Sequence, residues 1–62
     1  MELPELTTIE SADQARNLAI VWQHWYSENS LSYGEMIEYA EYFTKLATKF
    51  DLTDEFKENG II

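Results

Sequence analysis

Apolar side chains recur at helical spacing in the first half of the chain, between Ser11 and Glu28. At about 100° per residue, they gather on one side of a helix, opposite a polar side that includes Asp13 and Asn17. The apolar positions are Ala15, Leu18, Ala19, Trp22, Trp25 and Tyr26. The pattern predicts an amphipathic helix over residues 11–28.

A second pattern of the same kind runs from Ser32 to Phe50. Its polar side carries glutamates first and lysines last, as the helix dipole favours. Its apolar face is formed by Tyr33, Met36, Ile37, Tyr39, Ala40, Phe43, Leu46, Ala47 and Phe50. We expect a helix over residues 32–50 and, after a short break, a third helix over residues 53–59.

Residues typical of helix starts precede the two long segments. Ser11 with Gln14, and Ser32 with Glu35, have the spacing of a capping box, in which two side chains satisfy two free backbone N–H groups. Gly34 falls in the first turn of the second helix, where alanine is the more favourable residue. We therefore expect a bulky neighbour from the preceding helix, Trp25 or Tyr26, to approach Gly34 closely.

The third helix has its own start and stop signals. Thr53 is expected to cap it, with two acidic residues in its first turn. Gly60 fits the left-handed position after a helix that ends at Asn59. Phe56 and Ile61 then become the contact pair of a Schellman ending, and the last residues fold back onto the core.

These elements predict an all-α fold, a small three-helix domain made of an antiparallel helix pair and a short C-terminal helix. The single domain covers residues 11–62, and residues 1–10 form an extended N-terminal arm without helical periodicity. Leu3, Leu6 and Ile9 are placed to lay apolar groups of the arm on the body. A chain of 62 residues buries only about 60% of its unfolded surface, so additional burial is valuable.

Charge excludes several classes of function. The chain has 12 Asp and Glu against 4 Lys and Arg, a net charge of −8. Direct nucleic-acid binding and adhesion to anionic membranes both need cations, so neither is expected. The N-terminus lacks the basic and apolar regions of a signal peptide, and no apolar run approaches the ~20 residues of a membrane span. We expect a cytoplasmic protein.

Groups able to perform catalysis or bind metal are few. There is no Cys and one His, His24, which excludes a structural zinc site. His24 and Glu28 have i, i+4 spacing, but one imidazole and one carboxylate make neither a metal site nor a catalytic triad. The two glycines form no phosphate-binding loop. We expect no enzymatic activity, no cofactor and no metal, and an enzyme working through His24 and Glu28 is the least favoured interpretation.

One apolar residue breaks the pattern of the first helix. Ile20 points to the polar side, with Arg16 and His24 one turn away on either side. Aromatic and Arg side chains are enriched at interface centres, which suggests a candidate interaction surface. Its members are Arg16, Ile20, His24, Trp25 and Tyr42. Either the arm or the tail Ile61–Ile62 covers Ile20 within the chain, or another molecule does.

A second candidate surface is acidic. Carboxylates one helical turn apart are about 5–6 Å from each other. This spacing is comparable to the roughly 6–7 Å between phosphates along a nucleic-acid strand. The acidic residues concerned are Glu35, Glu38, Glu41, Asp54, Glu55 and Glu58. Such a surface either imitates nucleic acid or only keeps the protein in solution.

The sequence therefore favours a small, acidic, non-catalytic interaction module that forms a homodimer or binds one protein partner. The alternative, from a different class, is an inhibitor that mimics nucleic acid and blocks a DNA- or RNA-binding protein.

Overall fold

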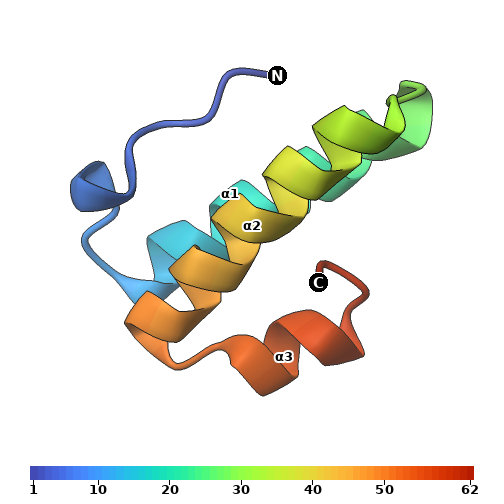
Figure 1. Ribbon diagram of the computed structural model, residues 1–62. Coiled ribbons are helices and arrows are strands. Elements are labelled where there is room, and N and C mark those ends of the chain that lie inside the picture. Colours follow the sequence, from blue (N-terminus) through green and yellow to red (C-terminus); the bar gives the residue numbers. More distant parts are fainter.

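The computed structural model describes all 62 residues and contains three α-helices and no strands. A single turn of 3-10 helix, η1 (Leu6–Thr8), precedes α1 (Ala12–Glu28), α2 (Tyr33–Phe50) and α3 (Thr53–Glu58). The helices α1 and α2 form an antiparallel hairpin, and the short α3 packs against it (Figure 1). The predicted fold class and the order of its elements are confirmed.

The two long helices begin at the predicted serines. Ser32 and Glu35 form the full capping box, with a 3.2 Å bond from the Glu35 N–H to Ser32 Oγ. Ser11 Oγ accepts from the Gln14 N–H at 3.2 Å, but the Gln14 side chain accepts from the N–H of Glu10, not of Ser11. The first capping box is therefore formed on one side only, because the glutamine reaches one residue further back along the arm.

The expectations for Gly34 and Thr53 were wrong. A Cβ added at Gly34 would meet no atom within 4 Å, so no bulky neighbour approaches it. Thr53 is the first residue of α3, and the preceding Leu52 occupies the cap without a side-chain hydrogen bond. The physical reason is a left-handed turn at Asp51 (φ 57°), which directs the Leu52 N–H onto the carbonyl of Ala47 at 2.8 Å.

The end of α3 is the predicted Schellman motif. The Ile61 N–H donates to the carbonyl of Phe56 at 2.8 Å, and the Gly60 N–H donates to that of Lys57 at 3.2 Å. Gly60 has the left-handed φ of 73° that this ending requires. Phe56 and Ile61 are both buried. The chain therefore reverses after α3 and returns its last two residues toward the hairpin (Figure 1).

The core consists of apolar residues only, and aromatic rings dominate its centre. Phe43 is fully buried, with ring centroids 5.0 Å from Trp22, 5.2 Å from Tyr42 and 6.4 Å from Phe56. The buried residues are Ile9, Ala15, Ala19, Trp22, Phe43, Leu46, Ala47, Leu52, Phe56 and Ile61. The α1 side contributes two fully buried alanines, Ala15 and Ala19, beside the large ring of Trp22.

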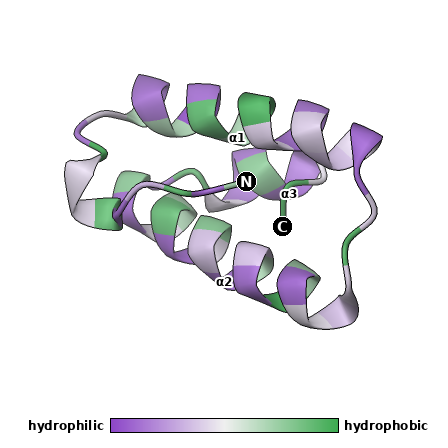
Figure 2. Cartoon of the chain, turned by 90° about the horizontal axis from the view of Figure 1, so that it is seen from above, coloured by the Kyte–Doolittle hydropathy of each residue, from purple (hydrophilic) through white to green (hydrophobic).

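The arm and α3 lie on opposite faces of the hairpin (Figures 1 and 2). We call the face under residues 1–10 the arm face and the other one the α3 face. Seen from above, the N-terminal segment runs over the space between α1 and α2 with α3 beneath them (Figure 2). No helix of this fold combines the length and the apolar character that a membrane span requires.

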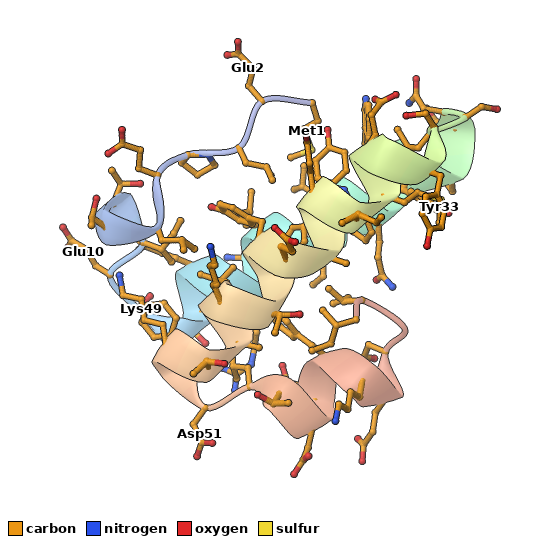
Figure 3. The ribbon with its side chains drawn as sticks, in the orientation of Figure 1. Met1, Glu2, Glu10, Tyr33, Lys49 and Asp51 are labelled. Carbon is orange, nitrogen blue, oxygen red and sulfur yellow. The ribbon has the colours of Figure 1, made fainter.

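Hydrogen bonds from α2 hold the arm along most of its length. The hydroxyl of Tyr39 donates to the carbonyl of Met1 at 2.9 Å, and the hydroxyl of Tyr42 donates to the carbonyl of Pro4 at 2.7 Å. Lys49 Nζ donates to the carbonyls of Leu6 and Ile9, at 2.7 and 2.9 Å, near the end of the arm (Figure 3). The arm therefore runs parallel to α2 and is an ordered part of the domain.

Candidate interaction site

The α3 face is covered over only part of its length. At 1.5 Å per residue, α2 is about 27 Å long and α3 is about 9 Å long. The helix α3 follows directly from the C-terminal end of α2, so it packs at that end and leaves the loop end of the hairpin free (Figure 1). Apolar residues of α1 and α2 that lie beyond α3 and the C-terminal tail have no covering layer.

An open groove of about 660 Å³ lies at this uncovered position. We call it the apolar groove, and its main walls come from α1, α2 and the tail. They are Trp22 and Tyr26, Met36 and Ala40, and Ile61 and Ile62. No charged residue lines the groove. Its volume falls in the range of sites that accommodate organic ligands or side chains of a partner.

Specific contacts fix the walls of the apolar groove. Gln23 Nε2 donates to the carbonyl of Asn59 at 2.6 Å and ties the tail to α1. The hydroxyl of Tyr26 donates to Met36 Sδ at 3.9 Å, across the hairpin. The ring of Tyr26 lies 5.2 Å from that of Trp22, whose buried indole N–H has no hydrogen-bond partner. These contacts connect the walls of the groove, the tail to α1 and α1 to α2.

The apolar surface extends past the groove along α2. Met36 and Ile37 are 43% and 42% exposed, and Tyr33 is 80% exposed. Figure 3 shows Tyr33 at the loop end of the hairpin, on the side of α2 that faces α3. A shallower hollow of about 310 Å³ continues over Ile37 and Ala40 toward Glu41. Most of the first half of the predicted apolar face of α2 is therefore surface, with the half-buried Tyr39 as the exception, whereas its second half is mainly core.

Residues of the apolar groove were not among the predicted interaction residues. Met36 and Ala40 had the same helical spacing as the buried Phe43 and Leu46, so periodicity alone placed all four on one face. The distinguishing signal is length, because a helix of six residues does not cover one of 18.

The predicted interaction surface is divided between two sides of the molecule. Arg16 and Ile20 line one small hollow of about 130 Å³ beside α3. Ile20 is 61% exposed, so neither the arm nor the tail covers it, and the intramolecular alternative is wrong. Trp25 and Tyr42 are half-buried and belong to the arm side. There the ring centroid of Trp25 lies 5.7 Å from that of Tyr39, whose hydroxyl donates to the carbonyl of Met1 in the arm.

Ion pairs account for the polar members of that surface. Arg16 Nε lies 2.8 Å from a carboxylate oxygen of Glu55, and Nη1 lies 3.0 Å from Asp13. The hydrogen bond and the charge of Glu55, followed by those of Asp13, raise the pKa of Arg16. His24 Nε2 is 3.5 Å from Glu28, and both side chains are exposed. No group of three or more potential metal ligands occurs in the structure.

The predicted acidic surface is also divided. Glu35, Glu38 and Glu41 are exposed on the first half of α2, at the loop end of the hairpin. Asp54 and Glu58 are exposed on α3, which packs at the other end, and Glu55 is half-buried in its ion pair with Arg16. The six carboxylates therefore form two groups, and only the α2 group lies at the open end of the hairpin.

No protein-family model, curated protein or solved structure matches the chain. The fold and the geometry of the apolar groove are thus the basis for an interpretation of its function.

Proposed function

We propose that this chain is a non-catalytic interaction module that binds one protein partner through the apolar groove. The observation that carries the proposal is an uncovered groove of about 660 Å³ with walls of aromatic and aliphatic side chains. Exposed apolar surface that is contiguous and concave marks interaction sites, whereas isolated exposed residues are ordinary. The groove, Ile37 and Tyr33 form such a contiguous surface on one side of α2.

Mimicry of nucleic acid, the alternative, has less support. A mimic presents a continuous track of negative charge, and here the acidic residues of α2 and α3 lie at different ends of the hairpin. In addition, Glu55 is already paired with Arg16. Catalysis through His24 and Glu28 has no supporting pocket, because neither residue lines the apolar groove.

A selection experiment with a matched pair of variants tests the proposal. The groove variant Met36→Gln/Ala40→Gln places two polar side chains in the groove walls. The control variant Ile20→Gln/Val21→Gln makes the same number of apolar-to-polar changes at exposed positions of α1 outside the groove. Circular dichroism and urea unfolding establish that both variants fold.

The bait is the whole chain, and the library displays helical peptides with fixed apolar positions and randomised Lys, Glu, Gln and Ala elsewhere. We expect selected peptides to bind the parent chain and the control variant, and to bind the groove variant at least about tenfold more weakly, as for loss of an interface anchor. Selected peptides that bind all three chains equally, or a selection without binders, would show that the groove is not the binding site.

A further inference from the structure

The open end of the hairpin carries charge of one sign. Between Arg16 and Lys45, the chain contains four glutamates and neither Lys nor Arg. We call Glu28, Glu35, Glu38 and Glu41 the hairpin carboxylates. One of them, Glu28, faces His24 at 3.5 Å, and the other three have no ion-pair partner. The end of the molecule that presents the apolar groove is therefore also its acidic end.

The four basic residues of the chain lie toward the other end or are already engaged. Arg16 is paired with Glu55 and Asp13, and Lys49 binds two carbonyls of the arm. Lys57 is on α3, and Lys45 is the residue of α2 at the far edge of the shallow hollow. No Lys or Arg forms an ion pair with a hairpin carboxylate, and the nearest along the chain is Lys45, which lines the same hollow as Glu41 one helical turn away.

On the basis of the proposed function, we infer that the occupant of the apolar groove is an amphipathic helix with a basic polar side. Apolar residues at positions i, i+3, i+4 and i+7 of such a helix fill a groove between two helices. Its Lys and Arg side chains then project past the groove toward Glu41, which lines the adjoining hollow. The other hairpin carboxylates line neither hollow, and Glu35 and Glu38 lie near Tyr39 on the arm face, so they add only to the negative field of this end, which physiological salt screens over about 8 Å.

A second copy of this chain fits the groove less well. It would bring a net charge of −8 against another of −8. The open end of each copy carries the four hairpin carboxylates and no Lys or Arg between Arg16 and Lys45, so association through this end would bring together two regions of like charge. Juxtaposed like charges oppose association, whereas a basic partner gains both attraction and a faster encounter.

The size of the uncovered surface sets the length of the partner. From Tyr33 to Ala40, α2 rises about 10 Å, which corresponds to two helical turns. A helix with three or four apolar anchors spans this distance. Peptides shorter than about 12 residues are poorly helical in water, so a probe of about 14 residues is suitable.

Two synthetic peptides test the charge of the occupant. Both have 14 residues with Leu at the four anchor positions and Ala between them, and the remaining positions are all Lys in one and all Glu in the other. Binding of each to the whole chain is measured by Trp fluorescence at 50 and 300 mM NaCl. We expect the Lys peptide to bind at least about tenfold more tightly at low salt, with a smaller difference at high salt.

Two variants of equal net charge test whether the location of the charge matters. One neutralises the hairpin carboxylates (Glu28→Gln, Glu35→Gln, Glu38→Gln and Glu41→Gln). The other neutralises four exposed carboxylates elsewhere (Glu2→Gln, Glu5→Gln, Glu10→Gln and Asp51→Asn). The first variant should bind the Lys peptide several-fold more weakly than the second. Equal losses would mean that only net charge attracts the peptide, and would overturn the inference.

Failure of the inference is distinguishable from failure of the proposed function. If the Lys and Glu peptides bind equally and both lose binding to Met36→Gln/Ala40→Gln, the groove binds a partner but not a basic one. If those two substitutions weaken the binding of neither peptide, the proposed function fails. Sedimentation of the chain alone tests whether a second copy occupies the groove. A dimer that the groove variant abolishes and that Ile20→Gln/Val21→Gln retains would overturn the inference.

Discussion

The arm face and the α3 face of the hairpin are covered by segments with similar numbers of residues. The arm contributes residues 1–10, and α3 with its tail contributes residues 53–62. An extended chain advances about 3.3 Å per residue, and a helix advances 1.5 Å. The arm therefore reaches along α2 from Lys49 to Tyr39, whereas α3 covers one end and the tail turns back toward the middle (Figure 1).

This difference decides which face is structural and which is available for binding. On the arm face, hydrogen bonds from three side chains of α2 hold backbone carbonyls of the arm, and Ile9 is buried. On the α3 face, Met36 and Ile37 keep more than 40% of their surface exposed. Substitutions on the arm face should therefore change the free energy of unfolding, and those on the α3 face should change binding.

The largest contrast is expected between Ile9→Ala and Met36→Ala. Ile9 is 7% exposed, and truncation of a buried Ile costs about 2–4 kcal/mol. Met36 is 43% exposed, so its truncation should lower the free energy of unfolding by less than about 1 kcal/mol. Urea unfolding followed by Trp fluorescence measures both. If Ile9→Ala leaves no folded baseline, Ile9→Val provides a milder loss of about 1 kcal/mol. Equal effects of the two alanine variants would contradict the division into a structural and a binding face.

A smaller loss is expected from Lys49→Met, with Lys45→Met as its control. Lys49 donates to two carbonyls of the arm, and Lys45 makes no hydrogen bond or ion pair. Removing the Lys49 contacts, which are partly exposed, should cost about 1 kcal/mol. The control should stay within about 0.5 kcal/mol of the parent chain. Proteolysis near the arm, followed by mass spectrometry, would detect its release in Lys49→Met, and protection equal to that of the control would count against the tether.

Local patterns predicted the elements of this fold well because the signals are local. The i, i+3 spacing of apolar residues, Ser32 with Glu35, and Asn59–Gly60 each fix a backbone conformation through neighbours in the sequence. Thr53 was misassigned because the left-handed turn at Asp51, a position with no glycine, directs the chain into α3 earlier. Asp tolerates this conformation, but the sequence alone does not reveal where it is used.

The candidate site was less predictable because it depends on which apolar residues the fold leaves uncovered. Periodicity correctly grouped Met36 and Ala40 with Phe43, and only the position and length of α3 separate surface from core. Ile20 was correctly identified as an apolar residue outside the core pattern, and the structure leaves it exposed. Trp25 and Tyr42 were assigned to the same surface, but both lie on the arm face, where Tyr42 binds the carbonyl of Pro4 and Trp25 packs on Tyr39. No pattern in the sequence specifies the path of the arm that defines this face.

The tyrosines of the arm face should make stability sensitive to high pH. Burial raises the pKa of Tyr42, and burial followed by the charges of Glu35 and Glu38 raises the pKa of Tyr39. A raised pKa in the folded state means that the neutral hydroxyl contributes stability below pH 10, the ordinary value, and that this contribution is lost as pH rises through the folded value. Unfolding free energy should therefore fall above pH 10.

The variant Tyr39→Phe/Tyr42→Phe isolates this effect. It removes both hydroxyls, so its stability should be lower near neutral pH but should decline less steeply above pH 10 than that of the parent chain. Tyr33→Phe is the control, because Tyr33 is 80% exposed and makes no hydrogen bond. Urea unfolding at intervals between pH 8 and pH 11.5 provides the comparison. Parallel curves for the double variant and the control would mean that the arm does not depend on these protons.

The smallest expected effect is a gain in stability from Gly34→Ala. Gly34 lies in the first turn of α2, and an added Cβ would meet no atom within 4 Å. Alanine should then stabilise the helix by about 0.5 kcal/mol, because it restricts the unfolded chain without strain in the folded one. Gly60→Ala is the contrasting control, since its φ of 73° makes alanine unfavourable by about 1 kcal/mol.

The sign of the Gly34→Ala effect bears directly on the open end of the hairpin. If another segment packed against this end, a new methyl group would have to displace it, and stability would fall. A gain measured by urea unfolding at several protein concentrations would show that nothing covers the start of α2, whether from the same chain or from a second copy. A loss that grows with protein concentration would instead indicate association through this end, and would make self-association the better account of the exposed surface of α2.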